Sequence, residues 1–230
     1  MIGDIDNYIQ LATTAICASV AFYNASKTRA REWLLLGLFS GLFFLGTLYY
    51  QLFYLFYNDD PHVVNISDLS WYTSYLFLLL LVIYINVQNR EQDIKENRKE
   101  TPARFSNGVR EWAQNTNPII WIVPVFTISM FILFIMRGDY FLNLVVLVFM
   151  TGIMWHAVYG LISLWGDPER TKQKMLFIVT LVFCLTEYAL WISSLFWSGY
   201  KITNIYFWFD FLLSFTFLLF IPAVKKVVSR

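Results

Sequence analysis

Seven apolar stretches of near bilayer-spanning length divide this chain, and they restrict its possible folds more than any other feature. A segment in the hydrocarbon core must satisfy its own backbone hydrogen bonds, and about 20 apolar residues form a helix long enough to cross it. We therefore expect an all-α, polytopic integral membrane protein, folded as a single seven-helix bundle domain over residues 1–230. The predicted membrane helices cover residues 8–23, 33–57, 69–87, 119–136, 140–165, 175–197 and 205–224.

The composition agrees with a protein whose main partner is the lipid bilayer. Charged residues make up only 14% of the chain, whereas soluble domains contain about 25%. The net charge of +1 gives no indication of a nucleic acid partner. Cys17 and Cys184 lie within apolar stretches, so we expect free, buried thiols. The acidic start of the chain lacks the basic region of a signal peptide, so we expect the first stretch to be retained.

Lysine and arginine are concentrated in every second connection between the apolar stretches. Fifteen of the 17 basic residues fall on one side of the predicted bundle, and only Arg137 and Lys201 fall on the other. Cytoplasmic loops carry the excess of basic residues in multi-pass membrane proteins. The pattern predicts an external N-terminus, a cytoplasmic C-terminus and a long cytoplasmic loop over residues 88–117. We expect this loop to begin as a short helical extension and to continue as an irregular connector. We expect the cell membrane as its location.

Three ionisable side chains interrupt the last three apolar stretches: His156, Glu187 and Asp210. A charge near the bilayer centre costs about 2.5–3.5 kcal/mol, so we expect both carboxylates to face the bundle interior. The three residues together predict a polar ladder able to hold a cation, a proton or a polar head group. The alternative is a structural role, in which Glu187 is protonated or hydrogen-bonded to His156, Tyr159 or Ser214 and fixes the helix packing.

The spacing of polar residues supports this orientation of the two carboxylates. Polar and aromatic side chains recur at steps of three or four residues, which places them on one face of each helix. On the first of the two helices these residues are Thr180, Cys184, Glu187, Trp191, Ser194 and Ser198. On the second they are Thr203, Asp210, Ser214 and Phe217.

Aromatic residues gather near the predicted outer ends of the helices. They are Tyr49, Tyr50, Tyr54, Tyr57, Trp71, Tyr72, Tyr75, Trp191, Trp197 and Trp208. Tyrosine and tryptophan form a belt at the membrane surface in many membrane proteins. The other interpretation is an outward-facing pocket for a small molecule or a lipid, with Trp71, Tyr75, Trp191 and Trp208 as its walls.

The sequence lacks the residues that several kinds of metal, cofactor and catalytic site require. The two histidines, His62 and His156, lie on different segments, so we expect no multi-histidine metal site. The lysines of the last stretch lie only at its ends, which rules out a retinal Schiff base in its middle. Neither a phosphate-binding glycine loop nor a GxSxG turn occurs. We expect no cofactor and no enzymatic activity.

One region resembles a known class of membrane module. The run from Gly46-Thr47-Leu48-Tyr49-Tyr50-Gln51 through Asn65-Ile66-Ser67-Asp68-Leu69-Ser70-Trp71 to Leu78 resembles helices two and three of bacterial seven-helix sensor modules. Such modules precede diguanylate cyclase or histidine kinase domains. The resemblance implies a sensory input module that passes a signal along its last helix to a cytoplasmic output domain. Because the chain ends at Arg230, it would be an excised piece or act through a separate cytoplasmic partner.

A small-solute transporter is the rival interpretation. Seven helices with an external N-terminus also suit a carrier built from two three-helix units and a linking helix, and central carboxylates suit proton coupling. The first three stretches show no repeat of the last three, which favours the sensory interpretation.

Overall fold

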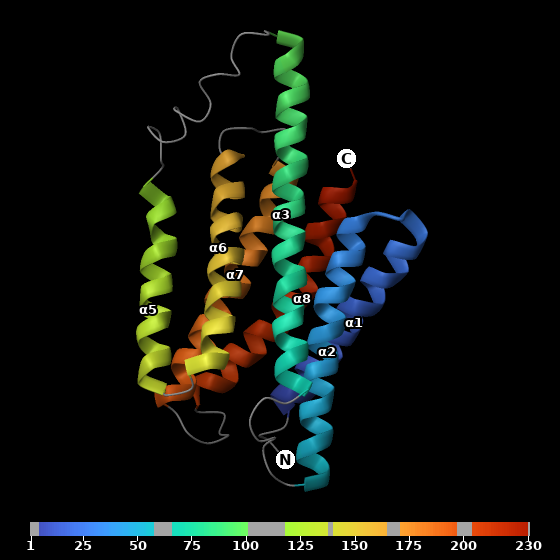
Figure 1. Cartoon of the computed structure of the whole chain (residues 1–230). Coiled ribbons are helices and arrows are strands. Elements are labelled where there is room, and N and C mark those ends of the chain that lie inside the picture. Colours follow the sequence, from blue (N-terminus) through green and yellow to red (C-terminus); the bar gives the residue numbers. More distant parts are fainter. Residues whose placement is uncertain are drawn as a thin grey trace.

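The computed structural model describes residues 5–57, 66–100, 118–137, 140–164, 171–196 and 204–229, and their regular structure is entirely helical (Figure 1). The α-helices are α1 (Ile5–Thr28), α2 (Arg31–Tyr57), α3 (Ile66–Glu100), α5 (Ile122–Arg137), α6 (Tyr140–Ser163), α7 (Thr171–Phe196) and α8 (Ile205–Val228). A short 3-10 helix, η3 (Pro118–Trp121), leads into α5. The all-α class predicted from the sequence is confirmed.

Five of these helices have the length and hydropathy needed to cross a membrane: α2, α3, α6, α7 and α8. Helix α5 is apolar but has only 16 residues. Helix α1 is long enough, but polar residues dilute its apolar content. The chain is therefore a multi-pass helical protein suited to a membrane, with two helices less apolar or shorter than the seven-span prediction assumed.

The helix ends differ from the predicted bounds mainly where the sequence becomes charged. Helix α3 continues to Glu100, well past the predicted end at residue 87, so part of the predicted loop is helical. Pro124 lies in the first turn of α5, where proline is tolerated because the first N–H groups of a helix have no partner within it. Helix α8 begins after Asn204, whose side chain accepts a hydrogen bond from the Tyr206 backbone N–H at 3.0 Å.

Six helices form a closed ring in the order α1, α2, α3, α6, α7 and α8, and α8 returns to pack against α1 (Figure 1). Helix α5 lies outside this ring against α6. The first and last helices of the chain are therefore neighbours. The tight turn between α1 and α2 depends on Arg29, which adopts the left-handed conformation with φ 57°. Its backbone N–H donates to the carbonyl oxygen of Ala25 at 2.8 Å and ends α1.

Five phenylalanine rings fill the middle of the ring, and we call them the phenylalanine cluster. Its members are Phe39 and Phe43 of α2, Phe183 of α7, and Phe217 and Phe220 of α8. The ring centroids of Phe43 and Phe217 lie 4.8 Å apart, and those of Phe39 and Phe183 lie 5.4 Å apart in an edge-to-face pair. Such offset and edge-to-face contacts are the favoured geometries of aromatic pairs. The cluster joins three helices that are distant in the sequence.

Candidate functional site

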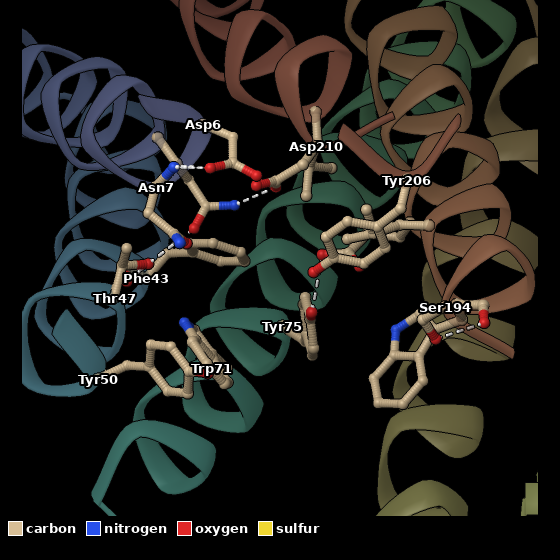
Figure 2. Close-up of a pocket in the computed structure, with 15 residues that line it drawn as sticks. Asp6, Asn7, Phe43, Thr47, Tyr50, Trp71, Tyr75, Ser194, Tyr206 and Asp210 are labelled. Atoms are coloured by element: carbon tan, nitrogen blue, oxygen red, sulfur yellow. Dashed lines mark hydrogen bonds between the residues drawn. The ribbon is translucent and has the colours of Figure 1, made fainter. Parts of the chain in front are cut away.

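A cavity of about 320 Å³ lies between α1, α2, α3, α7 and α8, at the end of the bundle where α1, α3 and α8 begin (Figure 2). We call it the polar cavity. The phenylalanine cluster forms its base, because Phe43 lines the cavity and the other four rings lie further along the same helices. A volume of this size is near the lower end of the range for small-molecule sites. Both Glu187 and Asp210 line it.

The Asp210 carboxyl group belongs to a network that ties the first helices to the last. The side-chain amide of Gln10 on α1 donates to Asp210 Oδ1 at 2.9 Å. The Thr47 hydroxyl on α2 donates to the amide oxygen of the same Gln10 at 3.1 Å. Figure 2 shows the Asp6 carboxyl group turned toward that of Asp210. Two acidic groups, each at most 3% exposed, are therefore held close together on the side of the cavity formed by α1 and α8.

The Glu187 carboxyl group is held from the other side of the ring. The Tyr75 hydroxyl on α3 donates to Glu187 Oε1 at 2.8 Å. The Trp191 side chain, one turn further along α7, also lines the cavity. Glu187 is 3% exposed, as expected for a carboxyl group that faces the interior. The bond from Tyr75 offsets part of the cost of burying this polar group.

Aromatic rings form much of the remaining wall. Trp71 packs against Tyr50 and Phe43, with ring centroids 6.2 and 6.3 Å apart. Gly46 permits this approach, because a Cβ atom there would come within 2.8 Å of the Trp71 ring. Tyr206 adds a ring from the start of α8 (Figure 2). The cavity therefore combines acidic groups with aromatic walls.

The charge of the lining is one-sided. Three carboxyl groups line the polar cavity, those of Asp6, Glu187 and Asp210. Among the residues that the structure describes, none of the lining side chains is a lysine, arginine or histidine. Within the same residues, no group of three or more His, Cys, Asp and Glu side chains is arranged to hold a metal ion. The arrangement suits recognition of a positively charged organic group.

Two of the predicted site residues lie elsewhere. His156 is on α6, which does not border the cavity, and its backbone carbonyl accepts a hydrogen bond from Asn86 at 2.8 Å. The predicted three-residue ladder is therefore wrong at this position. Trp208 is 54% exposed and does not line the cavity, so its predicted place in the wall is also wrong. Trp71, Tyr75 and Trp191 do line it.

The predicted hydrogen-bond partners of Glu187 were also wrong. Ser214 donates to the carbonyl oxygen of Asp210 on its own helix at 3.0 Å. The partner from another helix is Tyr75, which the sequence indicated only as an aromatic wall residue. Three members of the predicted polar and aromatic sets, Trp197, Ser198 and Thr203, lie outside the described residues.

Sequence reasoning missed the contribution of α1 and α2. Asp6, Gln10, Thr14 and Cys17 follow a helical spacing, and all four are buried. The low hydropathy of this stretch conceals an interior polar face, which the spacing of its polar residues indicates. Comparison of the chain with protein-family models, with curated proteins and with solved structures finds no match.

Proposed function

We propose that this protein is a receptor-like membrane module that binds a small molecule in the polar cavity and passes the binding event to a cytoplasmic partner. The observation that carries the proposal is the cavity itself, whose walls come from both ends of the chain. A ligand there would contact α1, α2, α3, α7 and α8 together. Binding that favours one arrangement of these helices shifts the population of the whole bundle. The resemblance of residues 46–78 to sensor modules supports the same function.

The base of the cavity favours binding over transport. Phe39, Phe183 and Phe217 are fully buried beneath it and pack ring against ring. A solute that crossed the bundle along this line would have to displace the cluster. The arrangement suits a ligand that enters and leaves at one end.

The route to the cytoplasm in this proposal uses α3. The helix carries Tyr75 at the cavity and extends to Glu100, beyond the apolar part of the bundle. A helix that is continuous from the cavity to the cytoplasm can transmit a tilt or a shift. Helix α8 carries Asp210 and ends with Lys225 and Lys226 in its last turn, at the same end as the α3 extension. These two ends are the proposed contact for the partner.

The proposal also includes seven membrane spans, with the N-terminus and the polar cavity outside. It rests on the alternation of basic residues in the sequence. Cysteine introduced by Ser106→Cys should resist an impermeant thiol reagent in intact cells, and Asn65→Cys should react. The native Cys17 and Cys184 are buried and give little background. The reverse pattern would contradict both the orientation and the entry of ligands from outside.

Binding is tested by a screen of small molecules against the purified protein in nanodiscs, with the unfolding temperature as readout. A ligand at about 100 times its dissociation constant stabilises the folded state by roughly 2.7 kcal/mol. The variants Ser194→Trp and Leu190→Trp each place a large side chain at the cavity wall, so they should abolish the shift. The matched control is Thr73→Trp, on an exposed position of α3. Equal shifts in all variants, or no compound that binds, would contradict the proposal.

Proton-coupled transport remains the second candidate, because two acidic groups facing each other, Asp6 and Asp210, are suited to exchange a proton. A compound from the screen should therefore be offered to proteoliposomes with an imposed pH gradient. A receptor binds the compound without accumulating it. Accumulation that depends on the gradient and is lost in Asp210→Asn would favour the transporter.

A further inference from the structure

We propose that the ligand of the polar cavity is a small organic cation, an amine or quaternary ammonium joined to an apolar or aromatic body. This inference deepens the proposed function and rests on it. It is carried by the combination of three lining carboxyl groups, aromatic walls and a volume of about 320 Å³.

The first step is the balance of charge. The carboxyl groups come from α1, α7 and α8, and each is at most 3% exposed. Like charges brought together away from water repel, and a cation between them removes this cost. A carboxylate has about four acceptor positions, so the bonds from Gln10 and Tyr75 leave room for an ammonium donor. The lining itself supplies no basic side chain within the described residues.

The second step is the nature of the walls. Trp71, Tyr75, Trp191 and Tyr206 line the same cavity as the three carboxyl groups. The faces of tryptophan and tyrosine attract ammonium groups, and rings of this kind form the cages that recognise quaternary ammonium ligands. Phe43, Leu190 and Leu213 add apolar surface for the rest of the molecule. A site built only to exchange protons would need neither the aromatic walls nor the volume.

The third step excludes other ligand classes. A metal ion needs several oxygen or nitrogen atoms within about 2–2.6 Å of one point, and the described residues offer no such group. An anion would meet three acidic groups and no basic partner from the described lining. A neutral apolar molecule would leave the acidic groups unused. An organic cation uses both kinds of surface.

The test uses compounds that differ in charge but little in size. One series is 2-phenylethylamine, 2-phenylethanol and 3-phenylpropanoate, and a second is 3-methylbutylamine, 3-methylbutanol and 4-methylpentanoate. Each is titrated against the full chain in nanodiscs, and the shift of the unfolding temperature gives an apparent dissociation constant. The variants are Asp210→Asn, Glu187→Gln and Asp6→Asn. With three variants, the test does not end if one of them fails to fold. The control is Asp68→Asn, which removes a charge from the same end of the bundle but not from the cavity lining.

The amines should bind at least about tenfold more tightly than the matched alcohols and carboxylates. Their affinity should fall by a similar factor in at least one cavity variant and stay unchanged in Asp68→Asn. Equal or tighter binding of the neutral or anionic compounds would overturn the inference and leave small-molecule binding in place. Amine affinity that is equal in the parent and in every folded cavity variant would overturn it in the same way. If none of the six compounds binds, the inference is overturned, and the proposed function then depends on the wider screen with Ser194→Trp.

Discussion

The polar cavity and the phenylalanine cluster share helices α2, α7 and α8 and meet at Phe43, yet the cavity adds carboxyl groups that the cluster lacks. On α8, Phe217 and Phe220 belong to the cluster, and Asp210 lies two turns nearer the helix start in the cavity. On α7, Phe183 belongs to the cluster, and Glu187 follows one turn later. The inner faces of α7 and α8 therefore change from aromatic to acidic within one or two helical turns. The base of the cavity lies where this change occurs.

The difference indicates how this bundle divides stability from function. Within lipid, apolar side chains gain little by leaving the solvent, so helices associate through close packing and through hydrogen bonds between them. The cluster supplies packing without any polar group. The cavity holds carboxyl groups that are expensive to bury, and Tyr75, Gln10 and Thr47 offset part of that cost. Stability should therefore depend mainly on the cluster, and the proposed ligand binding mainly on the cavity.

The largest effect is expected from Phe217→Ala. A hole of roughly 100 Å³ in the cluster costs about 2–3 kcal/mol at about 24 cal/mol per Å³. Reversible unfolding in detergent measures the change. The matched control is Phe215→Ala on the same helix, where the ring is 41% exposed and its loss leaves no internal hole. An equal loss of unfolding free energy in the two variants would contradict the idea that the cluster supplies most of the stability.

A smaller effect is expected for the bond between Tyr75 and Glu187. A double-mutant cycle of Tyr75→Phe and Glu187→Gln isolates their interaction energy. We expect about 1–2 kcal/mol, near the upper end for bonds between membrane helices, because the acceptor is a carboxyl group. The control cycle pairs Tyr188→Phe with Ser129→Ala, whose neutral hydroxyl groups lie 2.9 Å apart. If the interaction energy of Tyr75 and Glu187 is smaller than that of Tyr188 and Ser129, Tyr75 does not anchor Glu187.

The fold was predictable to the extent that it follows from hydropathy and helical period. Apolar stretches set the number of long helices, and steps of three and four residues placed Glu187 and Asp210 on interior faces. The exposed position of Trp208 was also available from spacing, because residues two apart on a helix point in different directions and Asp210 faces inward. The number of membrane spans and the orientation of the protein stay predictions.

The contacts between helices were not predictable in the same way. Periodicity indicates which face of a helix is buried, but not which helix lies opposite. Tyr75 and Glu187 are 112 residues apart, and Gln10 and Asp210 are 200 apart, so only the closed ring brings them together. His156 was expected in the site because it is the ionisable residue of the apolar stretch before that of Glu187. Helix α6 packs against α3 and α7 but does not border the cavity.

The smallest effect is expected from Gln10→Leu, which removes the link between α1, α2 and α8 without adding or removing a charge. The variant loses the bond to Asp210 and the bond from Thr47, and interhelical bonds of this kind contribute about 0.6 kcal/mol each in membrane proteins. We expect a loss of about 1 kcal/mol in the free energy of unfolding, because leucine fills a similar volume.

A second readout of the same variant sharpens the comparison between the two regions. Gln10 holds Asp210 in place, so its loss should weaken the binding of a cavity ligand by more than its small effect on stability suggests. The control is Ser40→Ala on α2, a fully buried residue whose hydroxyl donates to Leu36 on its own helix and which does not line the cavity. Ligand affinity should be unchanged there. If Gln10→Leu keeps its affinity while Phe217→Ala loses it, the cluster and not the polar network positions the site, and the division proposed for this bundle is wrong.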